Sequence, residues 1–581
     1  MKKRTIVFSL MATLITLSLV FTGACGGDEE EGKPKPGSLK DPQEITLNLG
    51  GEVVTIDPNR ASWSNERSVM MQVFDGMLAF DHDLKLVPMV AKEIPTVANK
   101  GISADGLTYT IKLRTDVKWS DGTKVTAKDF VFSIKRLFDP DLAAEYASMY
   151  CGTPADEDSG TPANKIGIVG AWECFYSDPE TEAEKTALRD AIGVRAKDEY
   201  TLEIKLRGAL PTFLPLLALW PTYPIRQDMV EKYGEAWAKP DANGAMPGYI
   251  GNGPFVLKEW VEQDHYTFVP NENYWGTKPY LTKITYKIIQ DAVAAVAAYQ
   301  NDELDQTGVV GGTEKTYMDD PVMSKQIVRG PVLGTYALQF NVTKEPFKDN
   351  KFLRQAIATA FDRVTYIDKI RGGVGKPATS WIPPGMTGYD PELGKEYTFN
   401  PTKAKELLAQ AGYTDPKTLK ITFQYANTGT NPVLAAFLQE MLVKNLGIDL
   451  TLEPMDSKAY SALYSAREFK WGFTGWGADY PDPENFLSSL YMTGAGNNKT
   501  SYSSAEYDAI AIKALKELDE TKRLQLWADA HALVVEDCPM CYVFFRETFV
   551  LKKSWVKGQF ITGMDGTLPG DMFLREVYIE K

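Results

Sequence analysis

The sequence is poor in the residue patterns that most often carry catalysis. Only three of its 581 residues are histidines, His82, His265 and His531, and they stand far apart, without the H-E-x-x-H spacing of a zinc site on a helix. No G-x-S-x-G motif is present for a serine nucleophile at a strand-to-helix turn. The sequence therefore does not support a histidine-rich metal enzyme or a hydrolase of that type.

Two short segments imitate ligand loops without completing them. GGVGK at 372–376 would place the first glycine of a phosphate loop on Ile370, and Pro377 stands where a magnesium-binding Ser or Thr is needed. DEDSG at 156–160 resembles the start of a calcium loop, but the final acidic ligand would fall on Gly167. We interpret both as turns or solvated loops, and we expect no cofactor and no metal.

Basic residues are outnumbered by acidic ones. The chain has 77 acidic against 63 basic residues, a formal net charge of -14, and no local stripe of Lys and Arg. Most of the surface would repel a phosphate backbone, which argues against nucleic-acid binding. With 44% hydrophobic and 11% aromatic residues the chain can bury several cores, and about 100 to 200 residues per domain suggests three or four structural units.

Long apolar runs are confined to the N-terminus. Basic residues 2–4 precede the apolar run 5–21, which is typical of an export signal rather than of a spanning helix. TGAC at 22–25 and a polar tether at 26–43 follow, an order that resembles a bacterial lipoprotein signal with Cys25 as the acylated residue. Such signals prefer Leu where this chain has Thr22. The alternative is an ordinary cleaved signal with an incidental cysteine.

The remaining four cysteines would then lie in an oxidising compartment. Cys151 and Cys174 bracket a Gly/Pro/acid-rich stretch, so a bridge between them is permitted. Cys538 and Cys541 form a C-x-x-C that precedes the apolar run YVFF instead of opening a helix after a strand. A local disulfide or two buried thiols is favoured there over a redox motif.

Periodicity alternates between strands and helices. Residues 108–113 and 200–206 alternate like half-buried strands. Helical spacing is found at residues 292–300, 351–363, 401–412 and 521–536. The mixture predicts an α/β protein with more than one sheet and no internal repeat.

Ten segments in colinear order together resemble family 5 of the bacterial extracellular solute-binding proteins, the oligopeptide- and dipeptide-binding group of ABC importers. The densest is SADGLTYTIKLRTDVKWSDGTKVTAKDFVFSIKRL at 103–137. The others lie at 53–61, 73–81, 193–206, 251–260, 271–281, 333–341, 346–363, 475–487 and 504–514.

This resemblance implies a two-lobe, type II periplasmic-binding-protein fold that closes around a ligand like a Venus flytrap. The lobes are joined by two hinge-crossing strands, and an extra subdomain is inserted in the first lobe. Carried onto this sequence, lobe I would cover 44–333, with the subdomain at about 93–190, and lobe II would cover 334–545. Residues 546–581 would return to lobe I. The two hinge crossings would lie near 332–336 and 544–548.

Asp479 lies in GWGADYPDP at 475–483. By itself this run is typical of a surface turn. Asp479 and Asp482 could in principle form a glycosidase carboxylate pair, but carboxylates three residues apart are common and the spacing gives that alternative little support. The resemblance implies instead that Asp479 holds the α-ammonium group of a peptide. A charge cut off from water by lobe closure costs several kcal/mol unless it is paired, so a fixed carboxylate is required.

The same matching implies the other ligand contacts. The backbone of residues 475–478 is expected to pair with one edge of the peptide and that of residues 62–64 with its other edge. Trp476 would wall the first side-chain pocket unless it only packs in the core, and residues 546–548 lie near a further backbone-contacting stretch at the hinge. The ligand-binding residues expected are Ser62, Trp63, Ser64, Gly475, Trp476, Gly477, Ala478, Asp479, Tyr480 and Arg546.

The expected role is a lipid-anchored, monomeric receptor that passes short peptides to a membrane permease driven by a separate ATPase. Two alternatives remain: a binding protein of the same family for an oligosaccharide, an opine or a metal complex, and a secreted enzyme or adhesin on the same scaffold. Fold alone does not decide among them.

Overall fold

The structure is a computed structural model that describes residues 34, 37–154, 163–428 and 431–581. Cys25 with its signal, most of the predicted tether and the acidic loop at 156–160 lie outside the described residues.

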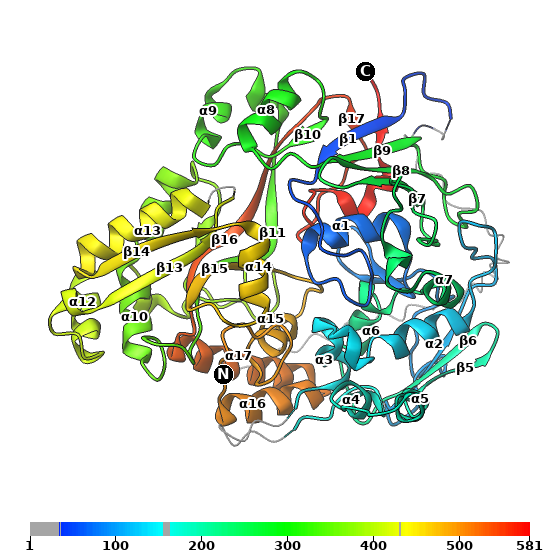
Figure 1. Ribbon diagram of the computed structural model, residues 1–581, viewed down its shortest axis with the longest axis horizontal. Helices are drawn as coiled ribbons and strands as arrows, with labels where there is room; N and C mark the ends of the chain where they lie inside the picture. Colours follow the sequence, from blue (N-terminus) through cyan, green and yellow to red (C-terminus); the bar gives the residue numbers. More distant parts are fainter. Residues whose placement is uncertain (1–33, 35–36, 155–162, 429–430) are drawn as a thin grey trace, which may run out of the picture.

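One mixed sheet runs through the whole molecule (Figure 1). Its outer strands pair mainly antiparallel, whereas β1 is parallel to both of its neighbours. In spatial order the strands are β15 (Trp471–Gly477), β11 (Ile327–Phe340), β16 (Met540–Lys552), β10 (Gln306–Thr307), β1 (Glu44–Asn48), β9 (Lys283–Lys287), β8 (His265–Pro270) and β7 (Phe255–Val261), and β12 (Lys376–Pro377) pairs with β16.

The two longest strands, β11 and β16, link the two halves of the molecule. At one end β11 pairs with β15, and at the other end β16 pairs with the short β10. The ladder between β11 and β16 is irregular between Pro331 and Thr335. That interruption lies in the first of the two predicted hinge crossings. A break in the ladder removes hydrogen bonds that would resist bending, which suits a hinge.

The half that contains β15 holds a second, parallel strand pair and most of the long helices (Figure 1, left). β13 (Lys420–Ala426) and β14 (Asp449–Met455) are joined through α13 (Asn431–Leu446), as parallel strands require a crossover. The other helices there are α10 (Lys351–Ala360), α11 (Arg363–Thr365), α12 (Pro401–Gln410), α14 (Ser457–Ser465), α15 (Pro483–Tyr491), α16 (Ala505–Lys516) and α17 (Glu520–Asp537).

The half that contains β1 carries smaller elements around the sheet. The helices are α1 (Ser64–Val73), α6 (Phe213–Leu216), α7 (Gln227–Tyr233), α8 (Ala292–Gln300) and α9 (Glu314–Asp319). Two short antiparallel pairs complete it, β2 (Leu78–Phe80) with β3 (Leu86–Pro88), and β17 (Val556–Lys557) with β18 (Tyr578–Ile579).

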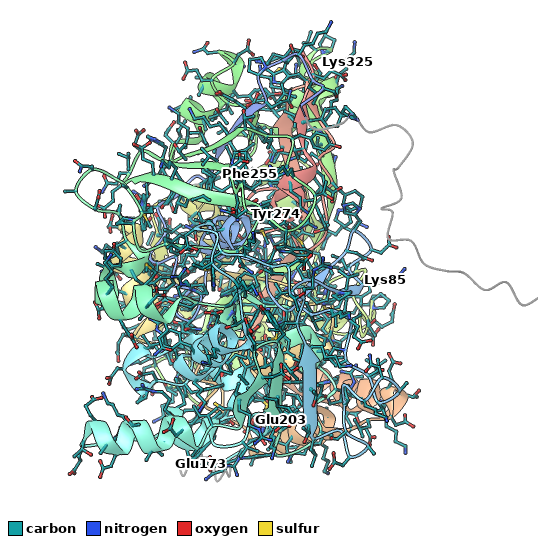
Figure 2. All side chains as sticks on the ribbon, turned by 90° about the vertical axis from the view of Figure 1, so that its right-hand side faces the viewer. Lys85, Glu173, Glu203, Phe255, Tyr274 and Lys325 are labelled. Atoms are coloured by element: carbon teal, nitrogen blue, oxygen red, sulfur yellow. The ribbon has the colours of Figure 1, made fainter. Side chains whose placement is uncertain are left out.

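A separate three-stranded sheet forms one end of the molecule. It consists of β4 (Thr108–Lys112), β6 (Thr201–Lys205) and β5 (Val194–Asp198), with α2 (Ala127–Arg136), α3 (Ser148–Cys151), α4 (Ala171–Phe175) and α5 (Glu182–Asp190) nearby. Figure 2 shows Glu173 and Glu203 of this unit far from Lys325 at the opposite end. Because β4 pairs with a strand beyond residue 190, we propose that the inserted unit extends to about 206.

The strands predicted at 108–113 and 200–206 are confirmed as β4 and β6, and the helices at 292–300, 401–412 and 521–536 as α8, α12 and α17. The helix predicted over 351–363 ends earlier, at Ala360. The reason is local: the Asp362 carboxylate accepts from the Thr365 amide and starts a new turn, α11.

All four described cysteines are buried free thiols. The permitted bridge between Cys151 and Cys174 is not formed, and of the two interpretations of Cys538 and Cys541 the buried thiols hold. Cys538 ends α17 in the left-handed conformation, and Cys541 already belongs to β16. The C-x-x-C therefore follows a helix and leads into a strand, whereas a redox C-x-x-C follows a strand and opens a helix.

Candidate functional site

A cavity of about 560 Å³ lies between the two halves. α14 and β15 line it on one side, and α1 with the turn before α3 lines it on the other (Figure 1). The predicted ligand-binding residues that line it are Ser62, Trp63, Ser64, Gly475, Trp476, Gly477, Ala478, Asp479 and Arg546.

Tyr480 is the predicted site residue that does not reach this cavity. Its side chain is fully buried, and its hydroxyl donates a hydrogen bond to the Glu484 carboxylate, one turn further along in α15. The direction of the chain after β15 turns this ring into the core, so Tyr480 supports the site from behind instead of contacting a ligand.

β15 presents an open edge to the cavity. Among the described strands it is the last of the large sheet, and its one partner there is β11. The Ala478 amide donates to the Leu333 carbonyl at 2.7 Å, and backbone groups alternate in direction along an antiparallel strand. The N–H and C=O groups of Gly475 and Gly477 therefore point away from β11, where an extended ligand can pair with them.

Asp479 follows this edge directly and is almost fully buried, with 6% of its surface exposed. The Asn485 amide and the Tyr146 hydroxyl both donate to Oδ2, at 3.0 and 3.1 Å. Among the described residues both hydrogen bonds fall on that oxygen, which leaves Oδ1 to a ligand. Burial raises the pKa of Asp479 to about 6, while Asn485, the Arg67 charge and Tyr146 act in the opposite direction.

Tyr146 and Trp476 form the aromatic wall next to this carboxylate. Their rings are stacked with centroids 6.5 Å apart, and the Trp476 indole N–H donates to the Asn485 side chain at 3.1 Å. Sequence reasoning missed Tyr146, because nothing in its local segment distinguishes it from a core tyrosine. It comes from the inserted unit and reaches the site only through the tertiary fold.

A single carboxylate organises the opposite wall. Glu66 in α1 accepts backbone N–H groups from Val54 and Thr55 on Oε1, at 3.2 and 3.0 Å. Its Oε2 accepts those of Ser62 and Trp63, at 2.8 and 3.0 Å. Because the Glu66 carboxylate accepts four backbone N–H groups, it fixes the loop that leads into α1 and faces the cavity.

This arrangement leaves the predicted backbone pairing of residues 62–64 with a ligand to fewer groups. Two of the three amide groups in that segment already donate to Glu66, and they are not available. The Ser64 hydroxyl lies 2.9 Å from that of Thr567. What the segment offers is mainly the Trp63 ring, 41% exposed and 6.4 Å from the Tyr464 ring across the cavity.

Contacts between the halves close the cavity on the side of the inserted unit. Lys499 forms an ion pair with Glu145 at 3.0 Å, and the Gly496 amide donates to the Ser148 hydroxyl at 3.2 Å. A Cβ added to Gly496 would lie 2.1 Å from the Glu145 carbonyl oxygen. The two backbones approach so closely only because Gly496 has no side chain.

The described residues were also compared with the requirements of a metal site and of a membrane-spanning helix. Across the described ranges, no three His, Cys, Asp or Glu side chains converge as a metal site would need. Within those same ranges, no helix has both the length and the apolar character needed to cross a bilayer.

Comparison with known families identifies a match over most of the chain. The profile described as "Bacterial extracellular solute-binding proteins, family 5 Middle" matches residues 85–498. Among curated proteins, the chain is 30% identical to the periplasmic oligopeptide-binding protein OppA of Salmonella typhimurium over 577 residues, which covers 98% of each chain.

Two solved structures bear on the arrangement of the halves. The Escherichia coli murein tripeptide binding protein MppA is 29% identical, covers 94% of this chain and 99% of its own, and superposes with a TM-score of 0.80. A structure described as the unliganded open form of MppA, also 29% identical and covering 93% and 98%, reaches 0.63. The halves of the present chain are therefore arranged less like that open form, in agreement with the contacts across the cavity.

Proposed function

The chain belongs to family 5 of the bacterial extracellular solute-binding proteins, and we propose that it captures short peptides between its two lobes and passes them to a membrane permease for import. The similar proteins described as oligopeptide-binding and murein tripeptide binding support a peptide ligand. Lobe closure around the ligand follows from contacts that only the closed form can make.

The observation that carries this proposal is the buried Asp479 carboxylate beside the open edge of β15. A receptor for peptides of many sequences must rely on what all peptides share, which is a backbone and an α-ammonium group. Gly475 and Gly477 supply the backbone partners, and Asp479 supplies the counter-charge. An ammonium group enclosed without such a carboxylate would be strongly disfavoured.

The rest of the cavity suits side chains of varied size and polarity. Hydroxyl groups of Ser457, Ser461 and Thr474 and the rings of Trp63 and Tyr336 line it together. In a space of about 560 Å³, water can complete hydrogen bonds that a particular ligand side chain leaves open, at small free-energy cost. Broad acceptance of peptide sequences follows.

The match to a family of extracellular solute-binding proteins supports export from the cytoplasm. We further propose that Cys25 is acylated and tethers a monomeric receptor to the outer face of the cytoplasmic membrane, and that ATP is hydrolysed by a separate subunit. Mass spectrometry of the mature protein tests the anchor: a chain beginning at diacylated Cys25 supports it, and an unmodified chain cleaved beyond Cys25 refutes it.

Titration calorimetry with a mixed tripeptide library tests the peptide function. The protein is first unfolded and refolded to remove carried ligand, and the library is used with free and with acetylated N-termini. We expect binding of the free library alone and a large loss in Asp479→Asn. Peptides recovered intact after incubation support a binding protein, whereas cleavage products would indicate an enzyme. No binding of either library by folded protein would point to a non-peptide solute.

A further inference from the structure

We propose that Arg67 selects peptides whose first residue has an acidic side chain and disfavours peptides whose first residue is basic. This inference rests on the proposed function and deepens it, because it takes the α-ammonium group of the peptide to be bound at Asp479. It concerns the side chain next to that group, whereas the remainder of the cavity accepts varied side chains.

Arg67 belongs to the face of α1 that lines the ligand cavity. It follows Trp63 by four residues and Ser64 by three, and residues at this spacing lie side by side on a helix. All three line the cavity, whereas the adjacent Glu66 is buried and holds the loop before α1. The guanidinium group of Arg67 therefore reaches the ligand space from the wall opposite β15.

The side chain of Arg67 has few contacts within the protein. Among the described residues it forms no ion pair and donates no hydrogen bond, and its guanidinium carbon lies 5.8 Å from the centroid of the Trp220 ring. At that distance a cation–π contact is weak and leaves the N–H donors unused. Arg67 is also the fourth residue of α1, and the helix dipole does not favour a cation near this end. These features suit a charge that serves a ligand rather than the stability of the fold.

The carboxyl groups near Arg67 have other partners. The charge of Arg67 acts on Asp479 and Asp571, and it opposes the rise that burial causes in the pKa of each. The two oxygens of Asp571 already accept hydrogen bonds from the Ser68 hydroxyl and the Gly566 amide. When a peptide binds, its ammonium group takes the charge of Asp479. Arg67 is then left without a carboxylate of its own.

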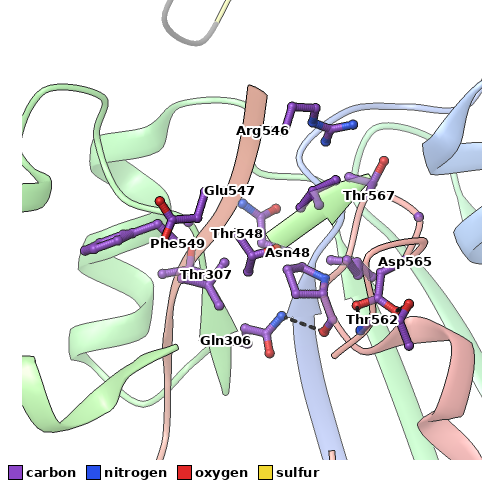
Figure 3. A pocket seen from close by; sticks show the side chains of 16 residues that line it. Asn48, Gln306, Thr307, Arg546, Glu547, Thr548, Phe549, Thr562, Asp565 and Thr567 are labelled. Carbon is purple, nitrogen blue, oxygen red and sulfur yellow. Dashed lines mark hydrogen bonds between the residues drawn. The ribbon is translucent and has the colours of Figure 1, made fainter. Parts of the chain in front are cut away.

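The other cations that line the cavity in the described part of the chain are placed differently. Lys499 forms an ion pair with Glu145 at 3.0 Å. Arg546 lies where the ligand cavity adjoins a smaller cavity of about 180 Å³. Figure 3 shows Arg546 at one end of this smaller cavity and Gln306 at the other. Arg67 is therefore the cation whose charge the first side chain of the peptide meets.

An acidic first residue supplies the missing counter-charge. Its ammonium group pairs with Asp479, and its side-chain carboxylate can accept two parallel hydrogen bonds from the planar guanidinium group of Arg67. A charge enclosed without a partner is disfavoured, so this pairing stabilises the complex. A basic first residue would instead place a second positive charge beside Arg67, and like charges repel strongly in an enclosed space.

The proposal is tested by titration calorimetry with tripeptides at about pH 7.5. Asp-Ala-Ala and Asn-Ala-Ala have nearly the same shape and differ in charge, and Lys-Ala-Ala is compared with Met-Ala-Ala, which is of similar length. In the wild type we expect Asp to bind about tenfold more tightly than Asn, and Lys about tenfold more weakly than Met. In Arg67→Gln both ratios should shrink to within about twofold, because the charge is gone. Arg67→Lys keeps the charge and should retain part of each ratio.

Two controls locate the effect. Arg546→Gln removes a different cation from the cavity and should keep the tenfold preference for Asp over Asn. Ala-Asp-Ala and Ala-Asn-Ala move the charge to the second residue, where the wild-type preference should fall below about threefold, because the carboxylate no longer adjoins the ammonium group. Each ratio is measured within one variant, so a general loss of affinity or stability does not imitate the expected result.

Several results would overturn the proposal and leave the peptide function standing. These are equal binding of the Asp and Asn peptides by the wild type, a preference that survives in Arg67→Gln, a preference lost in Arg546→Gln, or an effect of the same size at the second residue. Failure of folded wild-type protein to bind any of the peptides, or equal binding of their N-acetylated forms, would instead refute the proposed function.

Discussion

The Tyr146 hydroxyl lies 3.1 Å from Oδ2 of Asp479, although 333 positions separate the two residues in the chain. The inserted unit supplies Tyr146, and the segment after β15 supplies Asp479. Their contact joins the two halves beside the cavity, so the carboxylate proposed to bind the ligand is completed only when the halves meet.

Tyr146→Phe removes this hydrogen bond and keeps the ring beside Trp476. A hydrogen bond to a charged group contributes about 1.5 kcal/mol or more, so we expect peptide affinity to fall about tenfold. Calorimetry measures the loss. Tyr150→Phe is the matched control, because the Tyr150 hydroxyl donates to the Leu216 carbonyl away from the cavity. Equal losses in both variants would contradict a specific role for Tyr146.

Peptide affinity should depend on pH through Asp479. An α-ammonium group binds the ionised carboxylate, and burial raises the pKa of Asp479 to about 6 in the free protein. Affinity is expected to be highest between about pH 6 and 8. It should fall up to tenfold per unit below about pH 6, with proton release on binding, and fall again above about pH 8 as the α-ammonium group of the peptide, whose pKa is about 8, loses its proton. Calorimetry in two buffers of different ionisation enthalpy detects that release. Affinity that rises in acid would contradict this assignment.

Asp479→Asn should stabilise the ligand-free protein at neutral pH. Because the pKa of Asp479 is higher in the folded than in the unfolded protein, folding favours the protonated carboxyl group. The contribution of Asp479 to the free energy of unfolding is therefore fully present below about pH 4 and is lost as the pH rises through about 6. A shift of about two units corresponds to about 3 kcal/mol at most. In urea unfolding, the free energy of unfolding of the variant should exceed that of the wild type by up to this amount at pH 8 and equal it near pH 4. A constant gap at all pH values would exclude ionisation as the cause.

Gly496→Ala should impair lobe closure without unfolding the protein. The new Cβ would lie 2.1 Å from the Glu145 carbonyl oxygen, which both backbones must move to relieve. We expect at least a tenfold loss of affinity and a smaller ligand-induced compaction in small-angle X-ray scattering. Gly208→Ala is the control, since a Cβ there meets no atom within 4 Å. Normal compaction in Gly496→Ala would show that the halves tolerate the displacement.

Glu66→Gln should loosen the wall opposite β15. The amide nitrogen of Gln would face two backbone N–H donors in place of an acceptor, which leaves buried donors unpaired at about 1–3 kcal/mol each. We expect lower stability, weaker peptide binding and faster hydrogen exchange at Val54, Thr55, Ser62 and Trp63. Unchanged exchange at these amides would contradict the organising role of Glu66.

Much of the local structure could be predicted because its causes are local. The alternation at 108–113 is sufficient for β4, and Asn400 with Pro401 marks the start of α12. The early end of α10 depends on the side chain of Asp362, which helical spacing alone does not reveal.

Residue chemistry and order along the chain by themselves determined the alternation of helices and strands, the family resemblance and the choice of Asp479 as the counter-charge. The tertiary structure alone decided that Tyr146 completes that carboxylate, that Glu66 takes the amides of residues 62 and 63, and that Tyr480 turns into the core. It also placed the guanidinium group of Arg546 against Gly477. These are contacts between distant segments, and their geometry depends on how the two halves pack together, which no local pattern of residues encodes.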